Sequence, residues 1–111
     1  MPEIVVVGSL KARPGQEDAL DGALADLVAP THAEAGCILY ALHRGVDDPA
    51  RFAFVERWES REHLDAHLAS AHVAAVLARV DELFDEGGEI VVYDARPLGE
   101  DRKGALAGAA G

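Results

Sequence analysis

Two short segments near the two ends of the chain are apolar at every position. They are Ile4-Val5-Val6-Val7 and Ile90-Val91-Val92. Runs of β-branched residues favour strands, and successive side chains of a strand point to opposite faces of its sheet. Both strands therefore place apolar side chains on both faces. An antiparallel sheet with one face in water would alternate apolar and polar residues instead, so this sheet requires cover on both faces.

The rest of the pattern predicts six elements in a β-α-β-β-α-β order. These are a strand at 3–10, a helix from 17 to about Pro30, strands at 37–44 and 51–59, a helix from 61 to the Gly87-Gly88 pair, and a strand at 89–96. Pro30 is expected to end or kink the first helix, because its ring clashes with the preceding turn. Ser60 is the predicted N-cap of the second helix, and Ser70 permits a break within that helix.

This order is the split βαβ arrangement, an α+β subunit with a four-stranded antiparallel sheet and both helices on one face. The third strand places Phe52, Phe54, Glu56 and Trp58 on one side and Ala53 and Val55 on the other. Because two helices cover one face only, the opposite face leaves more apolar surface than a monomer normally exposes. We therefore expect an obligate homodimer, with two sheets packed face to face about a two-fold axis, and a pocket between sheet and helices in each subunit.

A chain of 111 residues holds one domain, which we place at residues 1–97, with a mobile Gly/Ala-rich tail at 98–111. The formal net charge of −10 disfavours nucleic acid and anionic membrane surfaces as partners, because both attract clustered cations. The single cysteine, Cys37, excludes an internal disulfide and fits a reducing compartment. We find neither a signal-peptide pattern nor an apolar run of membrane-spanning length, so we expect a cytoplasmic location.

Four segments stand out by their order and spacing. They are Lys11-Ala12-Arg13-Pro14-Gly15-Gln16-Glu17, then Ala35-Gly36-Cys37-Ile38-Leu39-Tyr40, then Asp48-Pro49-x-x-Phe52 leading into Glu56-x-Trp58-x-Ser60, and finally Leu64-x-x-His67-x-x-Ser70-x-His72. Together they resemble the antibiotic biosynthesis monooxygenase family over about residues 3–96. The resemblance implies a ferredoxin-like subunit that pairs as a dimeric α+β barrel. It also implies oxygenation of quinols or phenolic polyketides without metal, flavin or haem.

The chain departs from its relatives in two respects. Thr31-His32 stands where relatives commonly carry Ser/Thr-Arg. The haem-degrading branch uses an Asn on the first strand, with a Trp and a His on the second helix. Here the first strand has Gly8 and Ser9 in that neighbourhood, and the second helix has no Trp. Haem degradation is therefore disfavoured, and no cofactor is expected.

His67 and His72 are the first candidates for proton transfer. On a continuous helix, Leu64, Leu68 and His72 share a stripe and His67 lies on its margin, so both imidazoles lean towards the sheet. A cofactor-free oxygenase of the implied kind must deprotonate a phenol, and imidazole titrates near neutral pH. The alternative for each is a structural histidine bonded to a backbone carbonyl or placed at the dimer rim. His63 and His67 also have metal-ligand spacing, but no third ligand is evident, so no metal is expected.

Glu56 shares its row with aromatic side chains. A carboxylate there is either paired or protonated with a raised pKa, and either state suits acid–base chemistry. The alternative is an arginine or backbone partner at the dimer interface. Trp58 and Phe54 are candidates for stacking on a flat aromatic substrate, and Tyr40 for orienting it through its hydroxyl. The alternative for all three is ordinary core packing.

The resulting hypothesis is a cofactor-independent monooxygenase that oxidises a small phenolic or quinol-type aromatic compound with dioxygen. Two other functions suit the same pocket. One is a non-catalytic dimeric module that binds a small molecule. The other is an isomerase or lyase, which would need only the acid–base pair.

Overall fold

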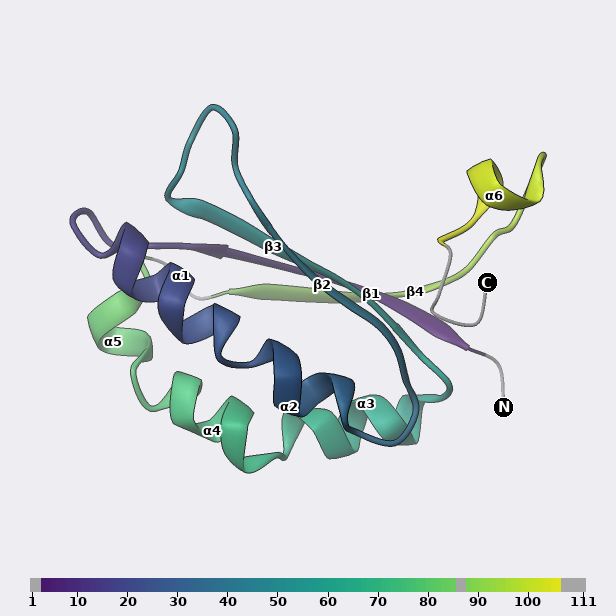
Figure 1. Cartoon of the computed structure of the whole chain (residues 1–111), viewed down its shortest axis with the longest axis horizontal. Helices are drawn as coiled ribbons and strands as arrows, with labels where there is room; N and C mark the ends of the chain where they lie inside the picture. Colours follow the sequence, from purple (N-terminus) through teal and green to yellow (C-terminus); the bar gives the residue numbers. More distant parts are fainter. Residues whose placement is uncertain (1–2, 86–87, 107–111) are drawn as a thin grey trace.

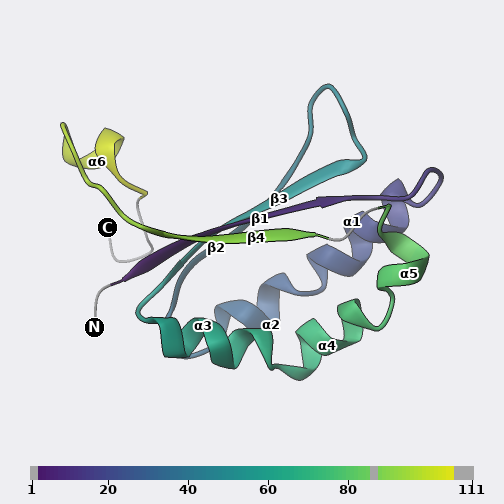
Figure 2. The ribbon, with the colours of Figure 1, turned by 180° about the vertical axis from the view of Figure 1, so that it is seen from behind.

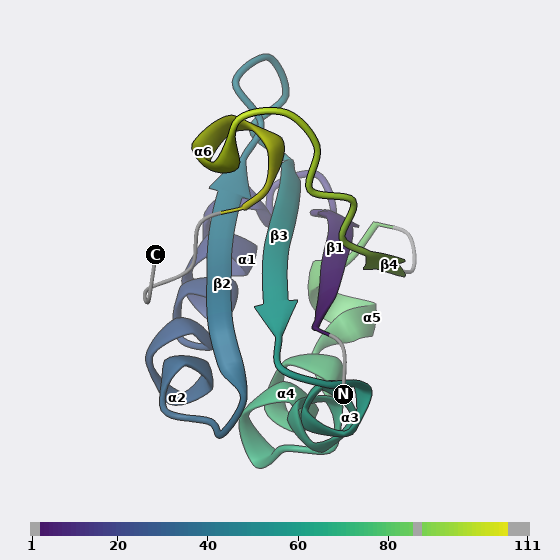
Figure 3. The same ribbon diagram turned by 90° about the vertical axis from the view of Figure 1, so that its right-hand side faces the viewer.

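The computed structural model of the chain describes residues 3–85 and 88–106. The strands are β1 (Ile4–Lys11), β2 (Cys37–Arg44), β3 (Arg51–Trp58) and β4 (Glu89–Asp94). The helices are α1 (Glu17–Ala25), α2 (Val28–His32), α3 (Arg61–Leu68), α4 (Ala71–Leu77), α5 (Val80–Leu83) and α6 (Asp101–Gly104). Neighbouring strands run antiparallel in the order β2-β3-β1-β4, which Figure 3 shows across the sheet. The predicted α+β class and four-stranded antiparallel sheet are confirmed.

Helices α1 to α5 all lie against one face of the sheet (Figures 1 and 2). The predicted row of β3 faces them, and its four members are buried: Phe52, Phe54, Glu56 and Trp58. Leucines of the helices, among them Leu20, Leu24 and Leu64, pack into the same core. The core is therefore a single layer between the sheet and its helices.

An irregularity in β2 decides which of its side chains face the helices. Its pairing with β3 shifts between Cys37 and Leu39, and Tyr40 then pairs with Glu56. One extra residue on one strand of a pair reverses the alternation of the residues that follow. Tyr40 therefore lies beside Glu56 on the helix side of the sheet, and Leu39 faces the opposite way.

The side of the sheet away from helices α1 to α5 is aligned in cross-strand rows. We define the open face by eight residues: Leu39, Arg57, Val5 and Tyr93 in one row, and Ala41, Val55, Val7 and Val91 in the next. The second row is apolar from edge to edge. In the first row, Arg57 donates to a Glu3 carboxylate oxygen at 2.8 Å and to the Leu106 carbonyl at 3.0 Å. The segment that carries α6 is thereby held against one end of the open face.

The first predicted helix does not end at Pro30 but is interrupted at residues 26–27, in the preceding turn with which the proline ring would clash. Helix α1 ends at Ala25, and α2 begins at Val28 and continues through Pro30. Pro30 is the third residue of α2. Its missing N–H therefore falls in the first turn, where backbone N–H groups have no acceptor within the helix.

The second predicted helix forms three pieces, α3, α4 and α5. Ser60 and Ser70 each accept a hydrogen bond from the backbone N–H three residues further on, which confirms the predicted N-cap and the break. Leu68 is 39% exposed, so the predicted stripe of Leu64, Leu68 and His72 does not face the sheet as one row. Helix α5 ends at Leu83, short of the Gly87-Gly88 pair predicted to end the helix; Gly87 lies outside the described residues.

The end of the chain follows β4, which ends at Asp94, two residues before the predicted limit of 96. The predicted tail contains one short helix, α6, and its residues 107–111 lie outside the described residues. Within the described part of the chain, no helix is both long enough and apolar enough to cross a membrane.

Gly36 in the connection between α2 and β2 generates a test of the fold. Its φ is +83°, and a Cβ there would overlap the ring of His63. We expect Gly36→Ala to lower the free energy of unfolding by at least about 2 kcal/mol, from backbone strain and overlap together. Urea denaturation followed by the fluorescence of the single tryptophan measures it.

Substitutions at two other glycines distinguish the cost of backbone strain from the cost of overlap with His63. Gly15 has φ +85° with open space around it, so Gly15→Ala should cost only the strain of about 1–2 kcal/mol. Gly22 lies in α1 with nothing near, and Gly22→Ala should be neutral or stabilise the helix by up to about 1 kcal/mol. A Gly36→Ala protein no less stable than Gly15→Ala would contradict the packing of His63 on this turn.

Candidate active site

A cavity of about 180 Å³ lies between the sheet and helices α1, α4 and α5, where a pocket was predicted. Its walls are aliphatic and aromatic, with Leu24, Val73, Val76 and Val80 on the helix side. Among the described residues that line it, the polar ones are Tyr40, Glu56 and Glu89, and Glu89 pairs with Ser9, so its side chain points to the other side of the sheet. The cavity is therefore an apolar chamber with a small polar patch on the sheet.

Glu56 is the centre of that patch. It is 6% exposed, and its Oε1 accepts a hydrogen bond of 2.9 Å from the indole Nε1–H of Trp58. Its Oε2 has no hydrogen-bond partner among the described residues, and it lies beside Gly8, which also lines the cavity. One carboxyl oxygen is thus held by the protein, and the other is available to a ligand.

Tyr40 forms the neighbouring part of the patch. It pairs with Glu56 across β2 and β3, and its ring stacks on Phe54 with centroids 4.5 Å apart. Burial raises the pKa of the Tyr40 hydroxyl, and the charge of Glu56 adds to this effect. The hydroxyl therefore stays protonated and can donate a hydrogen bond.

Burial also raises the pKa of Glu56 above that of an ordinary glutamate. The hydrogen bond from Trp58 and the charge of His67 act in the opposite direction without cancelling the effect of burial. Such a carboxyl holds its proton more tightly than an exposed one and is a stronger base once ionised. This is the behaviour required of a group that exchanges protons with a weakly acidic ligand.

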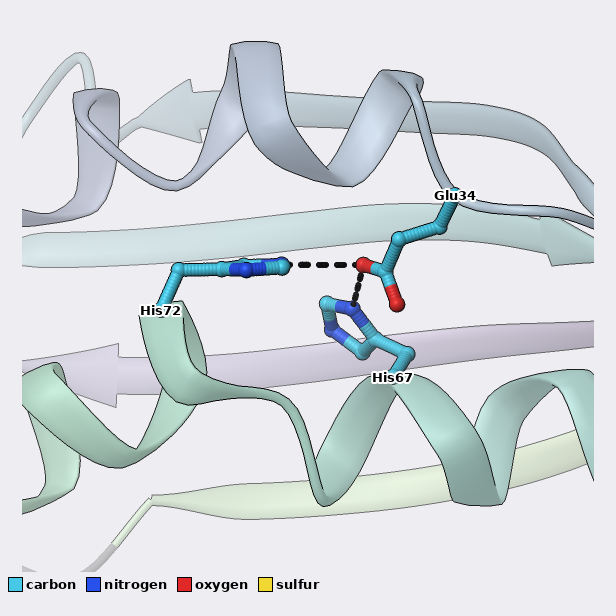
Figure 4. A group of neighbouring side chains, drawn as sticks. All are labelled: Glu34, His67 and His72. Atoms are coloured by element: carbon cyan, nitrogen blue, oxygen red, sulfur yellow. Dashed lines mark hydrogen bonds and ion pairs between the residues drawn. The ribbon is translucent and has the colours of Figure 1, made fainter.

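A second polar group lies outside the cavity lining and consists of Glu34, His67 and His72 (Figure 4). His67 Nδ1 and His72 Nε2 lie 2.7 Å and 2.9 Å from the same atom, Glu34 Oε2. A carboxylate oxygen can only accept hydrogen bonds, so both imidazole nitrogens carry the proton in this arrangement. Three separate segments meet here: the α2–β2 connection, α3 and α4.

The break between α3 and α4 makes this group possible. The expectation that both imidazoles lean the same way on a continuous helix is wrong, because residues five apart lie about 140° apart around the axis of such a helix. With Ser70 capping a new helix, both rings reach one carboxylate. His67 is 3% exposed, whereas His72 lies nearer the surface, with 23% of its side chain exposed.

The two polar groups are connected through Trp58. Its Nε1–H binds Glu56, and its ring packs against His67 with centroids 4.9 Å apart. Tyr40 also contacts His67, at 5.2 Å between ring centroids. The rings of Tyr40 and Trp58 therefore separate His67 from the cavity.

The six residues predicted from the sequence fall into two sets. Tyr40, Phe54 and Glu56 line the cavity. Among the described residues, the cavity lining does not include Trp58, His67 or His72, which lie behind it. The partner of Glu56 is Trp58, in place of the arginine or backbone donor considered as an alternative.

Sequence reasoning did not find Glu34. A signal for it is its place immediately before Ala35-Gly36-Cys37, in one of the segments that carry the family resemblance. That signal does not identify its partners, which are 33 and 38 residues further along the chain.

The same group could hold a metal ion. One ligand atom from each of Glu34, His67 and His72 lies within 4.8 Å of the others, and two imidazoles with one carboxylate suit zinc or iron. The pair considered from spacing, His63 and His67, does not converge in this way, because His63 Nδ1 is bonded to Ser60 Oγ at 2.8 Å. The two hydrogen bonds to Glu34 already satisfy the nitrogen atoms that face it.

Comparison with known proteins gives consistent matches. The family model described as "Antibiotic biosynthesis monooxygenase" matches residues 3–79. "Putative monooxygenase Rv0793" of Mycobacterium tuberculosis is 36% identical over 97 residues, covering 87% of this chain and 93% of that protein. "Probable quinol monooxygenase YgiN" of Escherichia coli is 33% identical over 82 residues, covering 65% of this chain and 79% of that protein.

A longer relative and a solved structure extend this comparison. The Synechocystis protein sll1783 is 27% identical over 90 residues, covering 81% of this chain but only 61% of its own length. The chain therefore spans less than two thirds of that relative. The structure of Rv0793 superposes with a TM-score of 0.78 at 33% identity, covering 88% of this chain and 97% of that one.

The raised pKa of Glu56 predicts how stability depends on pH. An acid whose pKa is higher in the folded chain stabilises the fold at low pH, and this contribution is lost as the pH rises through the folded pKa. Glu56→Gln removes the titrating group and keeps an oxygen that can accept from Trp58. Relative to the native chain, the variant's free energy of unfolding should therefore rise as the pH increases above about 4, the ordinary pKa of a glutamate.

Urea denaturation at a series of pH values measures this difference. Glu59→Gln removes the same formal charge from an exposed position next to β3 and is the control. A difference between Glu56→Gln and the native chain that stays constant over the pH range would contradict the raised pKa.

Proposed function

The chain belongs to the antibiotic biosynthesis monooxygenase family, and we propose that it is a cofactor-independent monooxygenase that oxidises a small phenolic or quinol-type aromatic compound with dioxygen. The observation that carries the proposal is the Oε2 of Glu56, which has no hydrogen-bond partner among the described residues and lies at the polar patch of an otherwise apolar cavity. The names of Rv0793 and YgiN, a monooxygenase and a quinol monooxygenase, support the same reaction class.

The substrate can supply all the electrons for this reaction. One oxygen atom of dioxygen is inserted at a ring carbon. The other leaves as water, together with the ring hydrogen and the hydroxyl hydrogen. A phenol thereby becomes a quinone, and a quinol becomes a hydroxyquinone. The first requirement is removal of the hydroxyl proton, because the electron-rich phenolate is the form that reduces dioxygen.

Glu56 is the residue we place in contact with the substrate hydroxyl. Its ionised Oε2 accepts the proton, and its raised pKa brings it closer to that of the phenol, which favours the transfer. Phe54 and Tyr40 provide a stacked aromatic wall for the ring, and the Tyr40 hydroxyl can donate to a second oxygen. The apolar walls exclude the water that would compete for the phenolate.

His67 and His72 act from behind this wall in the proposed mechanism. Positive charge on His67 lowers the pKa of Glu56 and so favours its ionised form. Glu34 holds both rings in place, and the partly exposed His72 ends the group on its solvent side. We therefore propose His67 and His72 as groups that set the charge of Glu56, with Glu34 as their positioning residue.

The proposed functional unit is a homodimer that buries the open face. The row Ala41, Val55, Val7 and Val91 is apolar across all four strands, and helices α1 to α5 lie on the other side of the sheet. A second copy packed about a two-fold axis covers such a row with its own equivalent. Sheet-on-sheet packing of this kind would also stiffen the strands that carry Glu56 and Tyr40.

Oxygen consumption tests the proposed reaction. Metal-stripped protein with methylhydroquinone or menadiol should consume oxygen faster than the spontaneous rate. Glu56→Gln should lower kcat by about 100-fold or more, in the range that a general base contributes. Glu59→Gln, with the same charge change at an exposed site, should retain the native rate.

The other outcomes identify the alternatives. Ligand binding without any acceleration of oxygen uptake would indicate the non-catalytic binding module. Conversion of the substrate without oxygen uptake would indicate an isomerase or lyase. Full activity in Glu56→Gln would leave the oxygenase but remove Glu56 from the mechanism.

The open face generates a separate test of assembly. In sedimentation equilibrium at micromolar concentration, the native protein should have twice the 11.7 kDa mass of the chain. Val55→Glu places a charge at the centre of the open face and should shift the protein to monomers. The matched control is Val46→Glu, at a valine that is 97% exposed, which should remain dimeric. A monomeric native protein would refute the proposed dimer.

A further inference from the structure

We propose that the cavity selects a single uncharged aromatic ring, and that Gly8 sets this selection by leaving a slot beside Glu56 for the hydroxyl-bearing edge of the ring. The inference deepens the proposed function and rests on it. It assigns a substrate class and a specificity-determining residue to the site.

Gly8 is the gap in an otherwise filled row of β1. The other residues of the strand that point to the helix side are Ile4, Val6 and Leu10, all with large side chains. On either side of Gly8, the paired residues Phe54 and Ile90 line the cavity, and so does Gly8 itself. A missing side chain at this point widens the cavity next to the Glu56 carboxyl.

Neither the backbone nor the packing explains a glycine at this position. The glycines with positive φ among the described residues are Gly15, Gly36 and Gly99, so Gly8 has a backbone conformation open to any residue. A Cβ on Gly8 would meet Glu56 Oε2 and Phe54 Cβ at 3.9 Å, which is ordinary contact. Glycine weakens a strand interior, and in that position it often marks the close approach of a ligand.

The volume of the cavity limits the ligand to about one ring. An apolar cavity of about 150 Å³ binds benzene, and this one measures about 180 Å³. One ring with small substituents therefore fits, whereas a fused second ring would have to project outwards. Ile90 and Leu77 line the cavity and are more than half exposed, which places the mouth between β4 and α4.

The charge of the lining limits the ligand to uncharged rings. In the described part of the lining, the ionisable groups are Tyr40, Glu56 and Glu89, with no cationic side chain to pair an anionic substituent. Burying an unpaired anion beside carboxylates is unfavourable. A ring bearing a carboxylate or sulfonate is therefore rejected.

Anaerobic calorimetry tests the proposal without turnover. The probes are methylhydroquinone, menadiol and 2,5-dihydroxybenzenesulfonate, which are one uncharged ring, two fused rings and one anionic ring. We expect the affinity of the native protein for methylhydroquinone to exceed its affinity for either of the other two probes by about tenfold or more. Gly8→Ala should weaken methylhydroquinone binding several-fold, and Gly8→Val by about tenfold or more, because the added methyl groups fill the slot.

Stability measurements distinguish a Gly8 variant whose slot is filled from one that is misfolded. Gly8→Ala and Gly8→Val should leave Tm unchanged or raised, because both residues favour a strand more than glycine does. Gly22→Ala makes the same chemical change on the exposed side of α1 and should bind like the native chain. The conservative Gly8→Ala carries the test if Gly8→Val fails to fold.

Three results would overturn the inference: unchanged binding in a folded Gly8 variant, equal binding of the sulfonate, or no binding of methylhydroquinone by the native protein. Oxygen uptake separates this failure from failure of the proposed function. Selective binding without oxygen consumption would refute the proposed oxygenase activity and would still support the role of Gly8 in selecting the ligand. Oxygen consumption with the same KM in native and Gly8→Val proteins would refute the role of Gly8 and would still support the proposed oxygenase activity.

Discussion

Strand β3 places a carboxyl group in a row of aromatic side chains that is buried beneath the helices, and the candidate site is organised around that group. Burying a carboxyl costs free energy unless it is hydrogen-bonded or protonated. The fold supplies both remedies: the Trp58 indole binds one oxygen of Glu56, and burial favours its protonated form. The second oxygen is left facing a cavity, where a ligand could complete its hydrogen bonding.

The group formed by Glu34, His67 and His72 provides a second layer behind this carboxyl. Trp58 lies between the layers, bonded to Glu56 on one side and packed on His67 on the other. Changes of charge on His67 therefore reach Glu56 through space, with no hydrogen bond between the two. The buried carboxyl thus faces an apolar cavity, and the outer imidazole of His72 is in contact with water.

The two faces of the sheet differ because helices α1 to α5 cover only one of them (Figure 1). The helix side holds the core, the cavity and the polar patch, and the open face carries an apolar row across all four strands. The irregularity in β2 assigns Tyr40 to the first face and Leu39 to the second. A single extra residue thus adds a hydroxyl to the cavity and an apolar side chain to the surface on which a second subunit is proposed to pack.

The amino-acid pattern alone predicts the element order, the antiparallel sheet, the row from Phe52 to Trp58 and the cap at Ser60, because each depends on periodicity or on neighbours a few residues apart. It also indicated an ionisable, aromatic-rich site, although the roles of those residues remain predictions. The remaining features depend on the packing of the elements in the folded structure. It placed Pro30 in the first turn of a separate helix, added a third piece to the second helix, and joined Glu34 to two histidines more than thirty residues away. It also separated the residues that line the cavity from those behind it. Such contacts depend on where helix breaks and strand irregularities direct each side chain in space. The spacing of residues within one short segment does not show which distant side chains will meet.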